Sequence, residues 1–482
     1  MKKINSILMV LFLVISAYSQ SNTQNEHQEW RSSEGRHTSF DIGTYITPDI
    51  VRNRLDVNVR LHSDYSRVSS NSEDNDDLFR TSDFSGNIQA HFSRYVNTRT
   101  RISSLTGSLS FSQNNDFEKF ERTFTDNRPN IIDNESNRHQ GNFLSLGWLN
   151  RWYFSDSFFL RYGAQSNIAY SLARNTTETY QSEKHTERRN MLSASFTPQI
   201  GIGFGRIENV TDARQAVYIA DALAKRNVLT RDLTNEELFE LSQLISTVKN
   251  KRFLDSRLHL IDEITAINAF FVENNLLEDN GAVYFTTLYD MWRYGALFSR
   301  RSGYEISFVV RPHYHYSNTK REHIVTQRDI SNNRQLSASL NFNYEKPFRL
   351  NWQHSVAASV RGDIYSHQWK NRDNDVDIRT DGRAFFASAG YFLGYFPNTR
   401  THIQVGASQA VSRNIIDEQG RFTAFSTSLS ATLYYYFSPN LRLAGVCGIS
   451  FAPSRHNWSG GGTFQRNSFS SQLNIQLTYH IF

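Results

Sequence analysis

Long apolar runs and cysteine are both scarce in this chain of 482 residues. Its longest apolar stretch, residues 7–15, is too short for a bilayer-spanning helix, which needs about 20 residues, and the mean hydropathy is −0.54. These values exclude a helical membrane protein. The one cysteine, Cys447, excludes a disulfide within the chain and lies far from any N-terminal lipidation site. The few prolines, 8 in all, suit a chain made mainly of strands.

The chain also lacks a strong charge of one sign. Its formal net charge is +5, with no long basic stripe or tail, so no nucleic-acid partner is expected. Aromatic residues are plentiful instead, with 23 Tyr and 35 Phe. Aromatic side chains favour strands and the headgroup level of a membrane.

Strict alternation of apolar and polar residues is the main pattern that is present. Residues 55–61 read Leu-Asp-Val-Asn-Val-Arg-Leu, and about thirteen similar runs follow. Because successive strand side chains point to opposite faces, the pattern predicts strands with lipid on one side and water on the other. We therefore predict a closed antiparallel transmembrane β-barrel of about 14 strands, near residues 52–66, 83–95, 101–113, 142–154, 158–172, 191–205, 303–316, 336–346, 350–365, 384–396, 401–412, 422–437, 441–451 and 469–482.

The N-terminus has the pattern of a secretory signal. Lys2 and Lys3 precede the apolar run, and small residues around Ala17 and Ser19 fit a cleavage site. The expected organisation is a signal peptide at 1–19, an N-terminal periplasmic segment at 20–51, and a first barrel half at 52–205. An α-helical periplasmic insert at 206–301 and a second barrel half at 302–482 follow.

Connections of alternating length give an orientation. Short turns belong to the periplasmic end of such barrels and long loops to the outside. The aromatic residues expected in the girdle beside the short turns are Tyr95, Trp152, Phe154, Phe158, Tyr344, Tyr395, Tyr435 and Phe437. Residues 40–46 also alternate, and we interpret them as a periplasmic segment or an extension of the first strand.

Helical spacing replaces the alternation between residues 206 and 301. Apolar residues recur every three or four positions in three runs, and a fourth short helix is expected over 284–294. Thr234 and Glu237 form a capping-box pattern. The insert could hang in the periplasm, plug the barrel or bind a periplasmic protein, and its apolar faces could simply pack on each other. Its basic residues are candidates for partner binding or form a solvated turn: Lys249, Lys251, Arg252 and Arg257.

Charged residues between the apolar positions of the strands are the candidates for lining the lumen: Arg60, His62, His91, Arg161, Arg311, His313, His315, Arg361 and Asp363. An arginine-lined constriction favours anions, whereas arginines paired with carboxylates would only fill the lumen. His313 and His315 alternate on one face without a recognisable third ligand, so no metal or other cofactor is expected. No Ser, His and acid spacing indicates a catalytic site. Asp74, Asp76 and Asp77 fit solvated loops, or divalent bridging to lipopolysaccharide, better than a calcium site.

The signal pattern, the alternating strands and the final residues Tyr479, His480, Ile481 and Phe482 resemble outer-membrane β-barrel proteins of Gram-negative bacteria. The segment 205–252 is similar to a helical insert in uncharacterised porin-like barrels. The resemblance implies a place in the cell outer membrane, contact with its lipids and lipopolysaccharide, and insertion by the barrel-assembly machinery.

The function expected from these features is a porin-like channel or transporter for small polar solutes, with the insert as a candidate gate. One alternative is an anchor, scaffold or export component whose insert binds a periplasmic protein. Another alternative is a surface hydrolase, which no residue pattern in the sequence supports. The oligomeric state stays open.

Overall fold

A single antiparallel sheet of fourteen strands forms most of the molecule. The computed structural model describes residues 40–72, 74–125, 129–179, 184–250, 259–278, 281–322, 325–417, 419–438 and 441–479. Each strand pairs with its neighbours in sequence. The strands are β1 (Ile50–Asn71), β2 (Asn75–Asn97), β3 (Arg101–Phe124), β4 (Ile131–Tyr153), β5 (Phe158–Glu178), β6 (His185–Asn209), β7 (Arg301–Glu322), β8 (Thr326–Phe348), β9 (Trp352–Asn371), β10 (Val376–Tyr395), β11 (Thr401–Ile416), β12 (Gly420–Tyr436), β13 (Leu441–Trp458) and β14 (Thr463–Tyr479).

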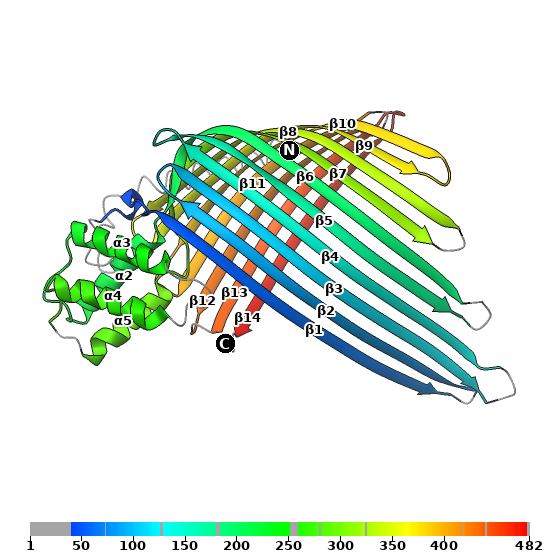
Figure 1. Ribbon diagram of the computed structural model, residues 1–482, viewed down its shortest axis with the longest axis horizontal. Helices are drawn as coiled ribbons and strands as arrows, with labels where there is room; N and C mark the ends of the chain where they lie inside the picture. Colours follow the sequence, from blue (N-terminus) through cyan, green and yellow to red (C-terminus); the bar gives the residue numbers. More distant parts are fainter. Residues whose placement is uncertain are drawn as a thin grey trace.

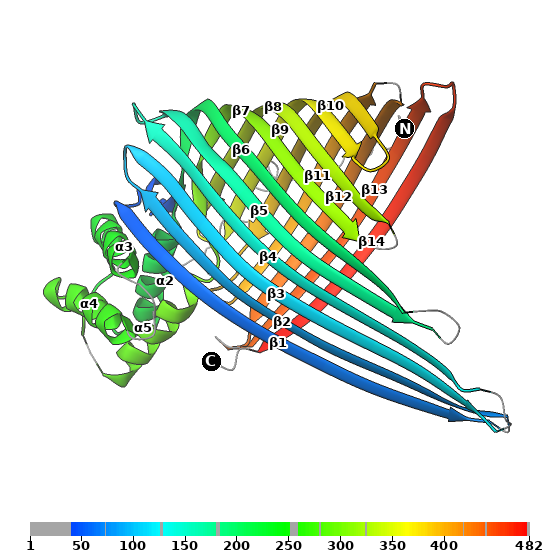
Figure 2. The same ribbon diagram turned by 45° about the vertical axis from the view of Figure 1, so that its right-hand side comes forward.

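The sheet curls round on itself, and the strands differ in length (Figures 1 and 2). The first six strands contain 21–25 residues and the last four only 16–18. A spanning strand needs about 9–11 residues. The wall on the β1–β6 side therefore projects well beyond a bilayer at the end with the long connections.

The fourteen antiparallel strands confirm the predicted fold class, but the two edges of the sheet differ from the expected closed ring. Among the described residues, β1 pairs only with β2 and β14 only with β13. Edge side chains are accordingly more open than those in the middle of the wall. Leu61 on β1 and Leu473 on β14 are 70% and 73% exposed, against 48% for Leu340 on β8. The hydropathy pattern gives the faces of a strand and cannot show whether the last strand meets the first.

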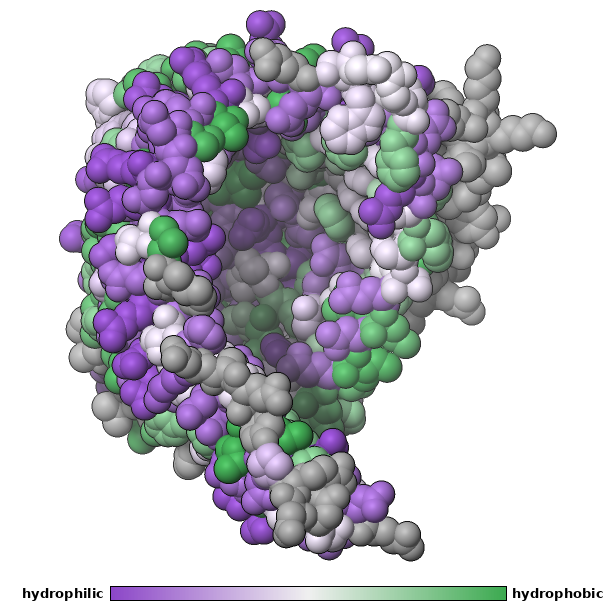
Figure 3. Space-filling view, turned by 90° about the vertical axis from the view of Figure 1, so that its right-hand side faces the viewer, coloured by the Kyte–Doolittle hydropathy of each residue, from purple (hydrophilic) through white to green (hydrophobic). Residues whose placement is uncertain are grey.

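The two faces of the wall have the expected polarity. Leu55, Val57 and Val59 on β1 lie on the outward face and are exposed, while Arg54 and Asp56 between them lie on the inward face. Figure 3 shows a hollow at the end with the long connections, with mostly hydrophilic residues around it. The wall therefore presents apolar side chains outward and polar ones inward, as a barrel in lipid requires.

Tyr95 corrects the predicted aromatic girdle. In the register of β2 it pairs with Arg52 and Ser104, which lie on the inward face. Tyr95 lies beside a short turn as predicted, but the strand register directs its ring toward the lumen. The other girdle residues beside the short turns include Trp152, which is 52% exposed on the outward face.

Four helices form the insert at the end with the short turns: α2 (Thr211–Lys225), α3 (Asn235–Asn250), α4 (Leu260–Glu273) and α5 (Ala282–Tyr294). The capping box is confirmed, because the Thr234 amide donates to Glu237 Oε2 at 2.8 Å and the Glu237 amide to Thr234 Oγ1 at 3.2 Å. β6 continues to Asn209, slightly beyond the predicted boundary. None of the helices in the described residues is long and apolar enough to cross a membrane.

Residues 40–46 pack on the insert and do not add a strand. A short 3-10 helix, η2 (Ile42–Thr44), begins at Asp41, whose side chain accepts from the Gly43 amide. Tyr45 is 1% exposed, and its hydroxyl lies 2.8 Å from Ser246 Oγ of α3. The segment is thus part of the same apolar core as the four helices. The predicted signal peptide lies outside the described residues.

Candidate functional site

An ion pair crosses the inward face near the short-turn end of the barrel. Arg151 on β4 lies 3.0 Å from the Glu305 carboxylate on β7, although β5 and β6 separate these strands. Glu305 is 3% exposed. Only side chains on the concave side of a curved sheet can meet across two intervening strands, so this pair identifies the lumen face. Arg161 on β5 lies near both residues but forms no ion pair within the part of the chain that the structure describes.

Three of the predicted lumen residues lie together in the next part of the wall. Arg361 lies 3.1 Å from Asp363 on β9, and Arg311 on β7 is close to both. Arg161 also interacts with Arg311. Within this group four arginines face two carboxylates, counting Arg151 and Glu305. Pairing inside this group is therefore partial, and the group retains positive charge.

The remaining predicted lumen residues do not join this group. His313 lies on the same face of β7 and is 2.7 Å from Thr197 Oγ1 on β6, with His315 one inward position further on. Arg60, His62 and His91 lie on β1 and β2, where His62 bonds Asp64 at 2.9 Å. No group of three or more His, Cys, Asp or Glu side chains in the described parts of the chain could hold a metal ion.

An aromatic cluster attaches the insert to the inside of the barrel mouth. Phe298, between α5 and β7, lies with its ring centre 5.0 Å from that of His402 and 6.0 Å from that of Phe396. Tyr434 and Tyr436 on β12 complete its surroundings. His402 pairs with Tyr434 in the register of β11 and β12, on the inward face. We call these five residues the Phe298 clasp.

Two buried arginines lie beside the clasp. The Arg214 and Arg300 guanidinium groups lie 5.0 Å and 4.7 Å from the centre of the Phe396 ring. Arg214 donates to the Phe298 carbonyl at 2.8 Å, and Arg300 to Gln353 Oε1 at 3.0 Å. Burial, reinforced by the charge of Arg214, lowers the pKa of Arg300 to about 9. Neither guanidinium forms an ion pair with a described residue, so the mouth holds two cations stabilised by carbonyls and an aromatic face.

Two further contacts extend the attachment along the rim. Asp290 on α5 lies 2.7 Å from Arg400 in the turn between β10 and β11, and the Arg400 guanidinium stacks over Tyr294. On the other side α3 lies against β1, and Thr47 Oγ1 donates to the Asn209 carbonyl at 3.2 Å. Figures 1 and 2 both show the helices at this end of the barrel. The insert therefore contacts β1 and also the ends of β10–β12. These two parts of the sheet lie far apart in strand order.

Lys249 needs a correction as a candidate for partner binding. It is 8% exposed, lies 2.6 Å from Asp212 of α2, contacts Gln215 and stacks over Trp292. Helical spacing turns this lysine toward α2, so it holds the insert together and does not extend a basic surface. Lys251, Arg252 and Arg257 lie outside the described residues. Of the predicted acidic loop residues, Asp77 is bound by Arg122 through two bonds of 2.7 Å.

The clasp and its arginines escaped the sequence analysis. Phe298 follows the last helix without a periodic pattern, and Phe396, His402 and Tyr434 each read as ordinary strand-end aromatics. Arg214 and Asp221 are the two charged residues among the buried positions of α2, most of which are apolar. A charged residue at such a position is the signal that could have pointed to a special contact.

No protein-family model matches this chain, and no curated protein matches its sequence. Among solved structures it is similar to the β domain of the Bordetella autotransporter Brka, with 10% identity over 72% of this chain and 96% of that one, at a TM-score of 0.22. It is similar to the transport unit of the Escherichia coli autotransporter AIDA-I, with 10% identity over 90% of each chain and a TM-score of 0.22. The ferric citrate transporter FecA gives 8% identity over 89% of this chain and 67% of that one, at a TM-score of 0.30.

Likenesses at such TM-scores carry no argument about activity. The architecture itself is informative: fourteen antiparallel strands with an apolar outward face and a polar inward face. Such a wall is stable with lipid outside and water inside. The chain therefore has the architecture of an outer-membrane β-barrel.

Proposed function

We propose that this protein is a non-enzymatic outer-membrane channel or transporter for small polar solutes, gated at its short-turn end by the helical insert. The observation that carries the proposal is the Phe298 clasp. It places a segment of the insert against inward-facing side chains of the mouth, where a displaced insert would open a path. A helical module that only hung beside the barrel would not need this contact.

The energetics of the attachment favour a movable gate over a permanent plug. Arg214 is 0% exposed, and its Nε and Nη1 have no hydrogen-bond partner in the described residues. Burying a cation without an opposite charge costs free energy that hydration would recover. Undocking would return water to both arginines. The free-energy difference between the closed and open positions is therefore smaller than the aromatic contacts alone suggest.

The lumen charges favour anionic solutes. In the group around Arg151 and Arg361 four arginines face two carboxylates, and this local arginine excess attracts anions into a water-filled passage. Fourteen strands give a barrel between the side-chain-filled eight and the open sixteen, so these side chains narrow the passage appreciably.

Conductance in planar bilayers tests the proposal. The full protein is compared with a variant in which residues 210–298 are replaced by a short linker, each at equal concentration and with folding checked by heat-modifiable gel mobility. We expect rare openings for the full protein, steady conductance for the deletion, and an anion-selective reversal potential in a salt gradient. If both proteins are folded and neither conducts, the channel proposal is wrong. Equal steady conductance of both proteins would contradict the proposal that the insert is a gate.

A further inference from the structure

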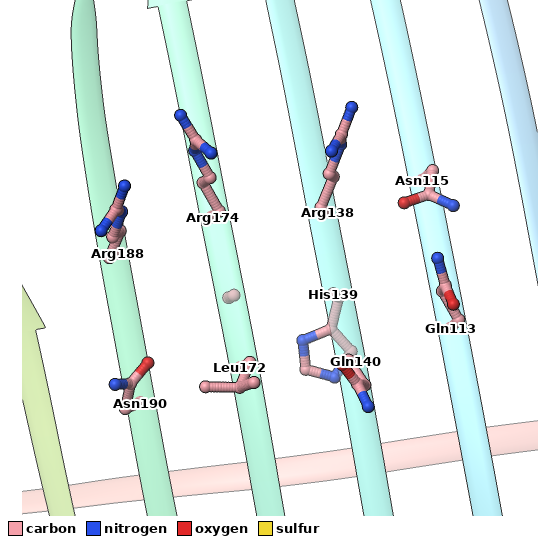
Figure 4. A pocket seen from close by; sticks show the side chains of 10 residues that line it. Gln113, Asn115, Arg138, His139, Gln140, Leu172, Arg174, Arg188 and Asn190 are labelled. Atoms are coloured by element: carbon pink, nitrogen blue, oxygen red, sulfur yellow. The ribbon is translucent and has the colours of Figure 1, made fainter.

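Three arginines form a continuous row on the outer surface of the barrel. Arg138 on β4 is paired directly with Arg174 on β5, and Arg174 with Arg188 on β6. All three side chains are exposed. Figure 4 shows them at the same level of three adjacent strands, above Gln140, Leu172 and Asn190. From this geometry we infer that the row binds the phosphate groups of a glycolipid in the outer leaflet.

The register assigns the row to the face that meets lipid. Pairing between β4 and β5, and between β5 and β6, runs without a bulge from the row to the short-turn end. Arg138 therefore lies on the same face of β4 as Leu144, Leu146 and Trp148, which are 36–51% exposed. Arg151 and the lumen cluster are on the opposite face.

The row lies directly above the apolar belt. On β5 the outward residues run from Leu160 to Leu172, and Arg174 is the next outward position. Twelve residue steps at about 3.3 Å and a tilt of about 40° cover about 30 Å, the thickness of a hydrocarbon core. The guanidinium groups therefore fall at the headgroup level of the leaflet on the side of the long connections.

Like charges directly opposite one another on neighbouring strands are destabilising. Within the described ranges these three side chains form no hydrogen bond or ion pair, and the one carboxylate paired with the row, Glu322 opposite Arg188, is bound to Lys320. Glu322 acts on Arg188 only through its charge, so the protein compensates the positive charge of the row only in part. Guanidinium groups bind phosphate through two parallel hydrogen bonds, which would relieve this repulsion.

A shallow depression of about 240 Å³ accompanies the arginines. Its lining adds amide side chains, among them Gln113, Asn115 and Asn190, to the guanidinium groups. Amides hydrogen-bond sugar hydroxyls, while the outward leucines just below the row suit acyl chains. Phosphate, sugar and acyl chain in this order are the chemistry of a phosphorylated glycolipid, whereas a free phosphate ion would use only the arginines.

Binding to the full-length protein in detergent tests the inference. The probes are phosphorylated lipid A, the same lipid after phosphatase treatment, and inorganic phosphate, each followed by native mass spectrometry. The test variant is Arg174→Gln with Arg188→Gln. The matched control is Arg189→Gln with Arg321→Gln, which removes two arginines from the inward face of β6 and β7 at the same level. Removing exposed like charges leaves the fold intact, and heat-modifiable mobility verifies this.

We expect the native protein and the control to bind phosphorylated lipid A equally, and the test variant to bind it about tenfold or more weakly. Phosphatase treatment should weaken binding to the native protein by a similar factor, and inorganic phosphate should compete poorly. Equal lipid binding by the test variant and the native protein would overturn the inference. Full competition by inorganic phosphate would show that the row binds free anions, and it would overturn the inference that a lipid is its ligand. This test is independent of whether the barrel conducts.

Discussion

The helical insert buries its apolar residues in its own core, whereas the barrel wall exposes them on its outward face. Most of the fully buried large apolar side chains belong to the insert, including Leu238, Leu241 and Ile245, each 0% exposed. On the wall, Leu61, Ile200 and Leu340 are 48–70% exposed. The insert is therefore stabilised by its own core in water, while the wall depends on backbone pairing and on lipid.

This difference implies that the two regions unfold separately. The hydrophobic core joins the four helices with residues 40–45 and includes few residues of the wall. The attachments at the rim are a small aromatic cluster and several polar contacts. Changes inside the insert should thus leave the barrel folded.

The largest expected effect comes from opening a cavity in the insert. Leu241→Ala on α3 should lower the free energy of unfolding of the helices by about 2–5 kcal/mol. Leu340→Ala on β8, the matched leucine on the outward face, should leave the helical transition unchanged. Urea titration followed by the helical circular-dichroism signal measures both. A barrel that melts together with the helices in Leu241→Ala would show that the two regions are one cooperative unit.

Acid should act on the insert before it acts on the barrel. Burial alone would raise the pKa of Asp212, but Lys249 and Ser246 lower it below its usual range. The hydrogen bond from Arg231 lowers the pKa of Glu237. A lowered folded-state pKa gives stability that is fully present above the unfolded value of about 4, and this stability is lost as the pH falls from that value through the folded-state pKa.

Helical circular dichroism against pH measures this effect. We expect the helical signal to weaken below about pH 4, while heat-modifiable mobility still reports a folded barrel. In Asp212→Asn the acid loss should be smaller, because one of the titrating groups is gone. The same acid profile in Asp212→Asn and the native protein would argue against this ion pair as a source of the effect.

The smallest expected effect concerns the capping box. Thr234→Ala removes the acceptor of the Glu237 amide and should cost about 1 kcal/mol of helix stability. Thr247→Ala near the other end of α3 is the control, since its hydroxyl bonds only the Gln243 carbonyl within the helix. Both are measured by the same urea titration. An equal loss of helix stability in Thr247→Ala and Thr234→Ala would contradict a special contribution of the cap.

Local patterns predicted much of this structure. Alternation gave the faces of the strands, and helical spacing gave the insert with the cap at Thr234. The lumen group of Arg161, Arg311 and Arg361 also follows from alternation, because residues between apolar positions must face inward.

Contacts between distant segments could not be predicted in this way. Periodicity shows which face of an element is apolar but not which other face it meets. Phe298 and His402 are separated by about a hundred residues, and Lys249 turns toward Asp212 only because α3 packs on α2. The unpaired edges of β1 and β14 are likewise a property of the whole sheet.

Single-channel conductance of Phe298→Ala tests the central claim, that the insert gates the mouth through the clasp. Phe308→Ala is the matched control, because Phe308 lies on the outward face of β7 and is 45% exposed. We predict frequent openings for Phe298→Ala, approaching the conductance of the deletion of residues 210–298, and native behaviour for Phe308→Ala. Native behaviour of Phe298→Ala, with the deletion conducting steadily, would contradict the clasp as the element that holds the gate closed.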